Sequence, residues 1–171
     1  MREYSFHAKS TNDLAKRLSV TLFVAAFLLL AVIFVFSVPY AGFIEGICVV
    51  LLTFAVLLLT RFVYKSFIYR VVMRDDGRFD LTVTERYGKG ETTVCRVALS
   101  GIERIEKLTD KNKKELRAAA KGRKSFSYCP DILSKDEYWV FVTECSEELL
   151  IKLAPDEELL AILLYAEKET T

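Results

Sequence analysis

The sequence predicts an α+β membrane protein in which a two-helix transmembrane hairpin precedes an antiparallel β-barrel or sandwich of about seven strands, capped by a C-terminal helix. Three observations support this prediction. Of the 43 residues from Leu18 to Thr60, 34 are hydrophobic. Short alternating runs separated by turn residues follow, and the chain ends in an amphipathic pattern. With 52% hydrophobic residues and a net charge of +1, this segregation excludes a wholly soluble enzyme, a disordered chain and a collagen-like fibre.

The first elements expected are two membrane-crossing helices. Leu18 to Val38 holds 21 residues without a charge, which as a helix would span roughly 31 Å, the thickness of a bilayer core. Residues 39–42 then supply a proline and a glycine, which break helices. A second apolar stretch runs from Phe43 to Phe62, interrupted only by Glu45 near its start. The two helices therefore form a tight hairpin.

The cations flanking the hairpin predict its orientation, because Lys and Arg near a helix end are retained on the cytoplasmic side. No basic residue lies between the helices, and both outer flanks are basic: Arg2, Lys9, Lys16 and Arg17 before the first helix, and Arg61, Lys65, Arg70 and Arg74 after the second. Both termini should be cytoplasmic. A cleaved signal peptide is the competing interpretation, but 21 apolar residues exceed its usual length of about 7–15.

This partition gives three segments: a cytoplasmic N-terminal segment at 1–17, the hairpin at 18–64 and a cytoplasmic domain at 65–171. Polar groups inside a membrane often mark a transport pathway. The candidates here are Glu45, Thr53 and Thr60, with Ser19, Thr21 and Ser37 in the other helix. Hydroxyl groups can bond to their own helix backbone, so anchoring is favoured over transport.

Alternating apolar and polar residues predict the β-strands of the cytoplasmic domain. In the clearest strand, 78–86, Phe79, Leu81 and Val83 alternate with polar residues, which indicates one buried and one wet face. It lies between a strand at 69–73 and a strand at 92–99. Turns at 75–77 and 88–90 separate the three.

The rest of the chain is predicted to complete a small core. Ile102, Ile105 and Leu108 are spaced by three, so residues 102–108 are compatible with strand or helix. Residues 110–122 have helical capacity. Further strands are expected at 125–129, 138–144 and 149–153, the middle one apolar on both faces. A final helix is expected from Pro155, with an acidic first turn and an apolar stripe of Leu159, Leu160, Leu163 and Ala166.

This pattern of about seven strands closed by one helix resembles the pleckstrin-homology-like (PH-like) barrel. The order of a short start, a membrane hairpin and a β-domain ending in the run from Leu149 to Leu160 is similar to the bacterial membrane-anchored YcxB-like proteins. The resemblance implies a location and a scaffold more than an activity. Lipid-binding PH domains commonly have a basic pattern around the first hairpin and a tryptophan in the final helix. In this sequence Asp75 and Asp76 lie in the first hairpin and oppose phosphate, and the only tryptophan, Trp139, lies in a predicted strand.

No residue constellation predicts catalysis or a cofactor. His7 is the only histidine and cannot form a catalytic or metal-binding group unaided. Cys48, Cys95, Cys129 and Cys145 form no CxxC pair, and a cytoplasmic domain keeps thiols reduced. Gly88-Lys89-Gly90 fits a hairpin turn rather than a phosphate loop. We expect no enzymatic activity, no cofactor, no metal and no small-molecule substrate.

One basic cluster, at 107–124, is a candidate contact for anionic lipid. Its eight cations face only Asp110 and Glu115, and they are Lys107, Lys111, Lys113, Lys114, Arg117, Lys121, Arg123 and Lys124. The cytoplasmic leaflet is anionic and attracts such segments. The alternative is a solvated mobile loop. Nucleic acid is not expected as a partner, since the cluster lacks aromatic residues and the chain is nearly neutral.

The function expected is that of a non-enzymatic membrane-anchored module for protein interaction or scaffolding at the cytoplasmic face, with the bilayer and a protein as partners. Tethering would raise the local concentration of such a module near membrane partners. The alternative is an accessory subunit of a membrane transporter or channel complex. An enzyme with a lipid-like substrate is the least favoured, because no catalytic group is evident.

Overall fold

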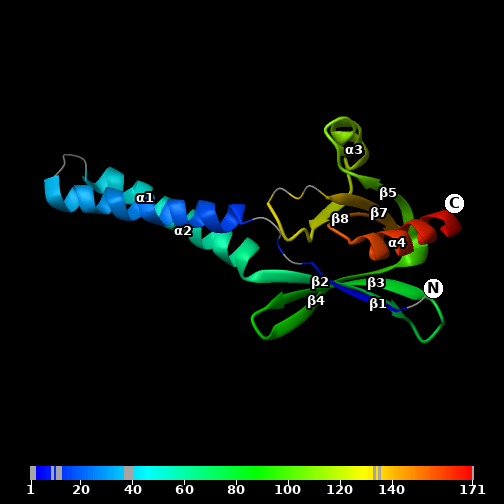
Figure 1. The fold of residues 1–171 in the computed structure, drawn as a ribbon. Coiled ribbons are helices and arrows are strands. Elements are labelled where there is room, and N and C mark those ends of the chain that lie inside the picture. The colour runs from blue at the N-terminus through cyan, green and yellow to red at the C-terminus, as the bar shows by residue number, and fades with distance from the viewer. Residues whose placement is uncertain are drawn as a thin grey trace. The chain divides into compact units, whose positions relative to one another are not determined.

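A computed structural model describes residues 3–8, 10, 13–36, 41–132, 134 and 136–170. The chain divides into two compact units, one comprising Ser10–Lys65 and the other Met1–Lys9 with Ser66–Thr171. We call them the helical hairpin and the β-rich unit (Figure 1). The predicted α+β arrangement is confirmed at this level: two apolar helices, two β-sheets and a C-terminal helix.

The helical hairpin consists of α1 (Leu14–Phe36) and α2 (Ala41–Leu58), with α2 continuing into a π-helical turn, η1 (Leu59–Val63). Segments of 22 and 23 residues, Leu14–Val35 and Ala41–Val63, are long and apolar enough to cross a membrane. The predicted break at 39–40 lies outside the described residues. Small side chains occupy the buried positions of the pair, and these are Ala15, Ser19, Ala26, Cys48 and Ala55.

The hydroxyl groups of both helices largely bond to their own backbone, as the sequence predicts. The Thr21, Thr53 and Thr60 hydroxyls donate to the carbonyls of Arg17, Val49 and Val56, at 2.9, 2.8 and 3.0 Å. Ser19 Oγ is buried and has no hydrogen-bond partner among the described residues. The Cys48 thiol donates to the Ala26 carbonyl of the facing helix at 3.6 Å. Cys48 therefore faces α1.

The first sheet, sheet A, has the order β1-β2-β3-β4. Its strands are β1 (Tyr4–Ala8), β2 (Lys65–Met73), β3 (Phe79–Tyr87) and β4 (Gly90–Ala98). The three predicted strands are confirmed within a few residues. Both predicted turns are also confirmed, because Gly77 and Gly88 have φ of +80° and +59°, the left-handed region that glycine tolerates.

Strand β1 adds a pairing that the sequence pattern alone does not predict. It lies antiparallel to β2, from Tyr4 opposite Val71 to Ala8 opposite Phe67. His7 Nε2 lies 3.0 Å from the Ser66 hydroxyl, and Ala8 is buried in the core. The helical hairpin is thus inserted between two neighbouring strands of one sheet.

The second sheet, sheet B, has the order β5-β7-β8-β6. A 3-10 turn, η2 (Leu99–Gly101), leads into it. Its elements are β5 (Ile102–Lys107), β6 (Lys124–Ser127), β7 (Tyr138–Glu144) and β8 (Glu147–Leu153), with helix α3 (Lys113–Ala119) between β5 and β6. The described residues therefore contain eight strands rather than about seven, and the helical capacity of 110–122 is confirmed.

In sheet B, the structure decides the conformation of the residues from Ile102 and corrects the predicted direction of one strand. The residues from Ile102 form a strand, and a register shift between Ile102 and Arg104 explains their spacing of three, since it turns Ile102 and Ile105 into the same core. Strand β6 is parallel to β8, so the prediction of a wholly antiparallel sheet is wrong. The reason is that β6 pairs with β8 rather than with its sequence neighbour β7.

The main core lies between the sheets and is closed by α4 (Glu157–Thr170). Leu159, Leu163 and Ala166 of α4 are buried there, whereas Leu160 packs at its margin. The predicted stripe is confirmed, but the helix begins two residues after Pro155, because Asp156 caps it by accepting a hydrogen bond from the Leu159 amide at 3.0 Å.

Strand β7 is apolar on both faces, as predicted. Val140 and Val142 point into the main core, and Trp139 and Phe141 point to the opposite side of sheet B. There they form a second, smaller core with Leu116 and Leu150. In Figure 1, α3 stands on this side of sheet B, away from sheet A.

The Tyr69 hydroxyl links the two sheets across the main core. It donates to the Tyr128 carbonyl at 2.9 Å and accepts from the Ala154 amide at 3.4 Å. Burial raises the pKa of Tyr69. The phenol therefore stays protonated and keeps its donor role at any physiological pH.

Candidate functional site

Helix α3 carries three of the eight predicted cations, Lys113, Lys114 and Arg117, and is fixed to sheet B at its base. Leu116, fully buried, packs with Trp139, Phe141 and Leu150. Ahead of the helix, the Asn112 side-chain amide donates to the Lys107 carbonyl at 2.9 Å, and Asn112 Oδ1 accepts from the Thr109 amide at 2.8 Å. The structure therefore gives this segment a packed helical turn rather than an unstructured loop.

Three of the eight predicted cations are neutralised by ion pairs. Lys107 Nζ lies 2.6 Å from Asp136 Oδ1, and Lys124 Nζ lies 2.8 Å from Glu147 Oε1. The Lys107–Asp136 hydrogen bond raises the pKa of Lys107. Because these two lysines already form ion pairs within the protein, they attract an external anion less strongly.

Arg123 is the most firmly held of the three. Its guanidinium pairs with Glu103 at 3.0 Å and with Glu148 at 3.2 Å. It also lies 5.2 Å from the Phe141 ring centroid, within the range of a cation–π contact. Its side chain is only 16% exposed, so Arg123 supports the sheet rather than a partner.

The other five cations are exposed and make no ion pair with any described residue. They are Lys111, Lys113, Lys114, Arg117 and Lys121, and we call them the α3 basic surface. Glu115, the acid within the helix, is engaged instead by Arg104 at 3.2 Å. Arg104 also pairs with Glu106. The net positive charge of the cluster is therefore concentrated on these five side chains.

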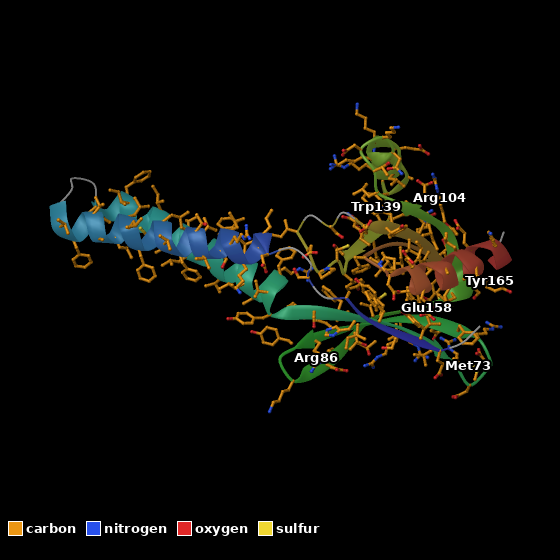
Figure 2. All side chains as sticks on the ribbon, in the orientation of Figure 1. Met73, Arg86, Arg104, Trp139, Glu158 and Tyr165 are labelled. Atoms are coloured by element: carbon orange, nitrogen blue, oxygen red, sulfur yellow. The ribbon has the colours of Figure 1, made fainter. Side chains whose placement is uncertain are left out.

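The helix presents its three cations on one side. At about 100° per residue, Lys113, Arg117 and Lys114 fall within an arc of roughly 100°, and buried Leu116 lies about 110° from its centre. Ala118 and Ala119 are exposed, and their small side chains leave the neighbouring ammonium groups accessible. Figure 2 shows nitrogen-tipped side chains extending outward from α3, with Trp139 near its base.

A second charge cluster on sheet A was not anticipated. Asp80 is fully buried, and its Oδ2 accepts from Arg96 Nε at 2.6 Å and from Arg74 Nη2 at 3.1 Å. Thr84, two positions further along the same face, is 3% exposed. The prediction that this face of β3 is wet is therefore wrong at Asp80 and Thr84. At Asp80 the reason is that arginines from β4 and from the end of β2 close over the carboxylate.

Two cysteines of the β-rich unit, Cys95 and Cys129, are not set up as nucleophiles. Burial raises the pKa of the Cys129 thiol to about 12 and also raises that of Cys95. Such thiols stay protonated at neutral pH and react slowly. Over the described ranges, no three His, Cys, Asp or Glu side chains gather in a way that could hold a metal ion.

The chain matches no protein-family model, and comparison with curated proteins and with solved structures also gives no match.

Proposed function

We propose that this chain is a non-enzymatic, membrane-anchored PH-like module that binds a protein or supports a complex at the cytoplasmic face of the cell membrane. The observation that carries the proposal is the insertion of the helical hairpin between the paired strands β1 and β2.

The strand pairing favours two crossings over one. Ala8 lies opposite Phe67, so the chain that leaves sheet A before α1 returns to the same sheet after η1. Only residues 9–13 and Tyr64 separate the strands from the helical segments. Because both connections are short, both ends of the hairpin belong on one side of a bilayer. The cations flanking the two helices support the proposal that this side is the cytoplasm.

The β-rich unit supports the PH-like part of the proposal. Two four-stranded sheets enclose one core, and a C-terminal helix closes it. The parallel pairing of β6 with β8 is a departure from a simple antiparallel meander. A stable body of this kind, held beside the membrane, meets membrane partners at high effective concentration without any catalytic group.

The test is a chimera that keeps β1 and replaces residues 14–63 with an unrelated two-helix membrane hairpin. Photo-crosslinking in membranes, followed by purification and mass spectrometry, should recover the same protein neighbours from the chimera as from the natural chain. Recovery of no specific neighbour from the natural chain would refute the scaffold role.

The alternative, an accessory subunit of a transporter or channel complex, is favoured by one observation on α2. A shallow hollow lined by Gly42, Gly46 and Val50 opens on the side of α2 roughly opposite Cys48 and Ala55, which face α1. A second helix could approach closely there. Neighbours that crosslink to the natural chain but not to the chimera would support this alternative over the scaffold.

A further inference from the structure

The α3 basic surface differs from the rest of the predicted cluster because its cations form no ion pairs with described carboxylates. Lys107, Arg123 and Lys124 each have a carboxylate within 3.2 Å. Over the residues that the structure describes, the five cations of the α3 basic surface have none. An external anion therefore meets five cations that form no ion pair, and within the segment 110–122 they outnumber the two acids, Asp110 and Glu115, of which Glu115 is paired with Arg104.

The composition of this surface favours a diffuse anionic partner over a shaped one. Four of the five cations are lysines, whose ammonium groups act as point charges on flexible stems rather than as bidentate forks. No aromatic side chain lies between Asp110 and Gly122 to stack on a nucleic-acid base. The exposed apolar residues of the segment 110–122 are Ala118 and Ala119, which offer little apolar area to the anchor residue of a peptide.

From these observations we infer that the α3 basic surface binds the anionic phospholipid head groups of the membrane that holds the helical hairpin. The inference rests on the proposed function for its tether, since the hairpin keeps a charged leaflet permanently near the β-rich unit. It deepens that function by assigning a second, electrostatic contact with the bilayer. Clusters of Lys and Arg beside a membrane-spanning segment are attracted to anionic lipid in this way.

The rigid base of α3 gives this contact a structural consequence. Leu116 is held by Trp139, Phe141 and Leu150 of sheet B. A head group bound at Lys113 or Arg117 therefore restrains the whole sheet rather than a loose segment. Anionic lipid would limit the orientations that the β-rich unit adopts, whereas zwitterionic lipid would leave it free to reorient on its tether.

The experiment uses the full chain reconstituted in two nanodiscs, one of pure phosphatidylcholine and one with about 30% phosphatidylglycerol. Lysine reactivity is measured by brief acylation and mass spectrometry at low salt. Lys113, Lys114 and Lys121 should react at least about threefold more slowly in the anionic disc. Salt at about 1 M, where the Debye length is about 3 Å, should abolish the difference. Equal rates in the two discs would overturn the inference.

Two exposed lysines far from α3 in the sequence, Lys89 and Lys168, serve as internal controls and should react alike in both discs. The variant K113Q/K114Q/R117Q should lose the protection of Lys121. The control variant K89Q/K168Q should retain it. Loss of protection at Lys121 in both variants would show a general charge effect and would also overturn the inference.

The outcomes separate this inference from the proposed function. A chain that enters neither disc would refute the tether and the lipid contact with it. An inserted chain whose α3 lysines remain reactive would refute the lipid contact alone. Protection that is seen in native membranes but not in the anionic disc would assign the α3 basic surface to an acidic protein instead of lipid.

Discussion

The described buried positions in the helical hairpin are occupied by small residues, whereas most of those in the β-rich unit are occupied by larger ones. Ala26 and Ala55 are fully buried between α1 and α2, while Phe34 and Phe43 are 87% and 73% exposed. In the β-rich unit, Phe67 and Tyr69 are at most 1% exposed. The same residue types thus lie inside one unit and outside the other.

This difference fits the proposal that the hairpin lies in lipid and the β-rich unit in water. Burying a large apolar side chain away from water contributes about 1.5–3 kcal/mol, which drives the formation of the β-rich core. In lipid that driving force between helices is absent, and close packing of small residues takes its place. The exposed phenylalanines of the hairpin are therefore consistent with a bilayer as its surroundings. Strand β1 directly precedes the hairpin in the sequence and pairs with β2 in sheet A of the β-rich unit.

The largest effect is expected when β1 is removed, as in a fragment containing only residues 65–171. The fragment loses five residue pairs with β2, the burial of Ala8 and the Tyr4–Asp156 hydrogen bond at the start of α4. Its free energy of unfolding should fall by about 3 kcal/mol or more, from lost burial and hydrogen bonds together. Urea denaturation followed by Trp139 fluorescence measures this.

The matched control keeps β1 and replaces residues 14–63 with a flexible linker. If the β-rich unit is stabilised by β1 itself, this control should be more stable than the fragment. Equal stability of the two proteins would show that the pairing of β1 with β2 contributes nothing, and the hairpin would then be an appendage rather than an insertion.

An intermediate effect is expected in the hairpin when a small buried residue is enlarged. Ala55→Leu adds volume at a position with no exposure, whereas Val56→Leu changes a neighbour that is 48% exposed. Overpacking typically costs about 1–3 kcal/mol. Loss of helical circular dichroism during SDS titration should come earlier for Ala55→Leu and be unchanged for Val56→Leu. Equal shifts for both variants would argue against packing through small residues.

The sequence predicts the features that depend on residues close together in the chain. The two long helices follow from apolar runs, although α1 begins at Leu14, four residues before the predicted Leu18. Strand β3 follows from alternation at Phe79, Leu81 and Val83. The double-faced strand β7 follows from its unbroken apolar run. The amphipathic stripe of α4 is also local. Each of these patterns reports burial directly, which is why elements could be placed within a few residues.

Features that depend on distant residues were not predictable in the same way. The pairing of β1 with β2 joins strands separated by the whole hairpin. The division of the basic cluster depends on carboxylates remote in sequence: Asp136 lies 29 residues from Lys107, and Glu103 lies 20 residues from Arg123. Charge counting over 107–124 identified the cations but could not show which of them already had partners. The burial of Asp80 likewise depends on Arg96 of β4, 16 residues away.

The smallest effect is expected at the turn between β7 and β8, which contains no glycine. All of the described residues with positive φ lie in the β-rich unit, and only Cys145 and Ser146, with φ of +51° and +67°, are not glycine. Left-handed backbone costs a non-glycine residue about 1–2 kcal/mol, partly offset by the greater freedom of glycine in the unfolded chain. Ser146→Gly should therefore raise the free energy of unfolding by up to about 1 kcal/mol in urea denaturation and leave the SDS titration of the hairpin unchanged.

The control is Ser125→Gly in β6, an extended position, which should lower the free energy of unfolding slightly. If Ser146→Gly also lowers the free energy of unfolding, the turn is not strained.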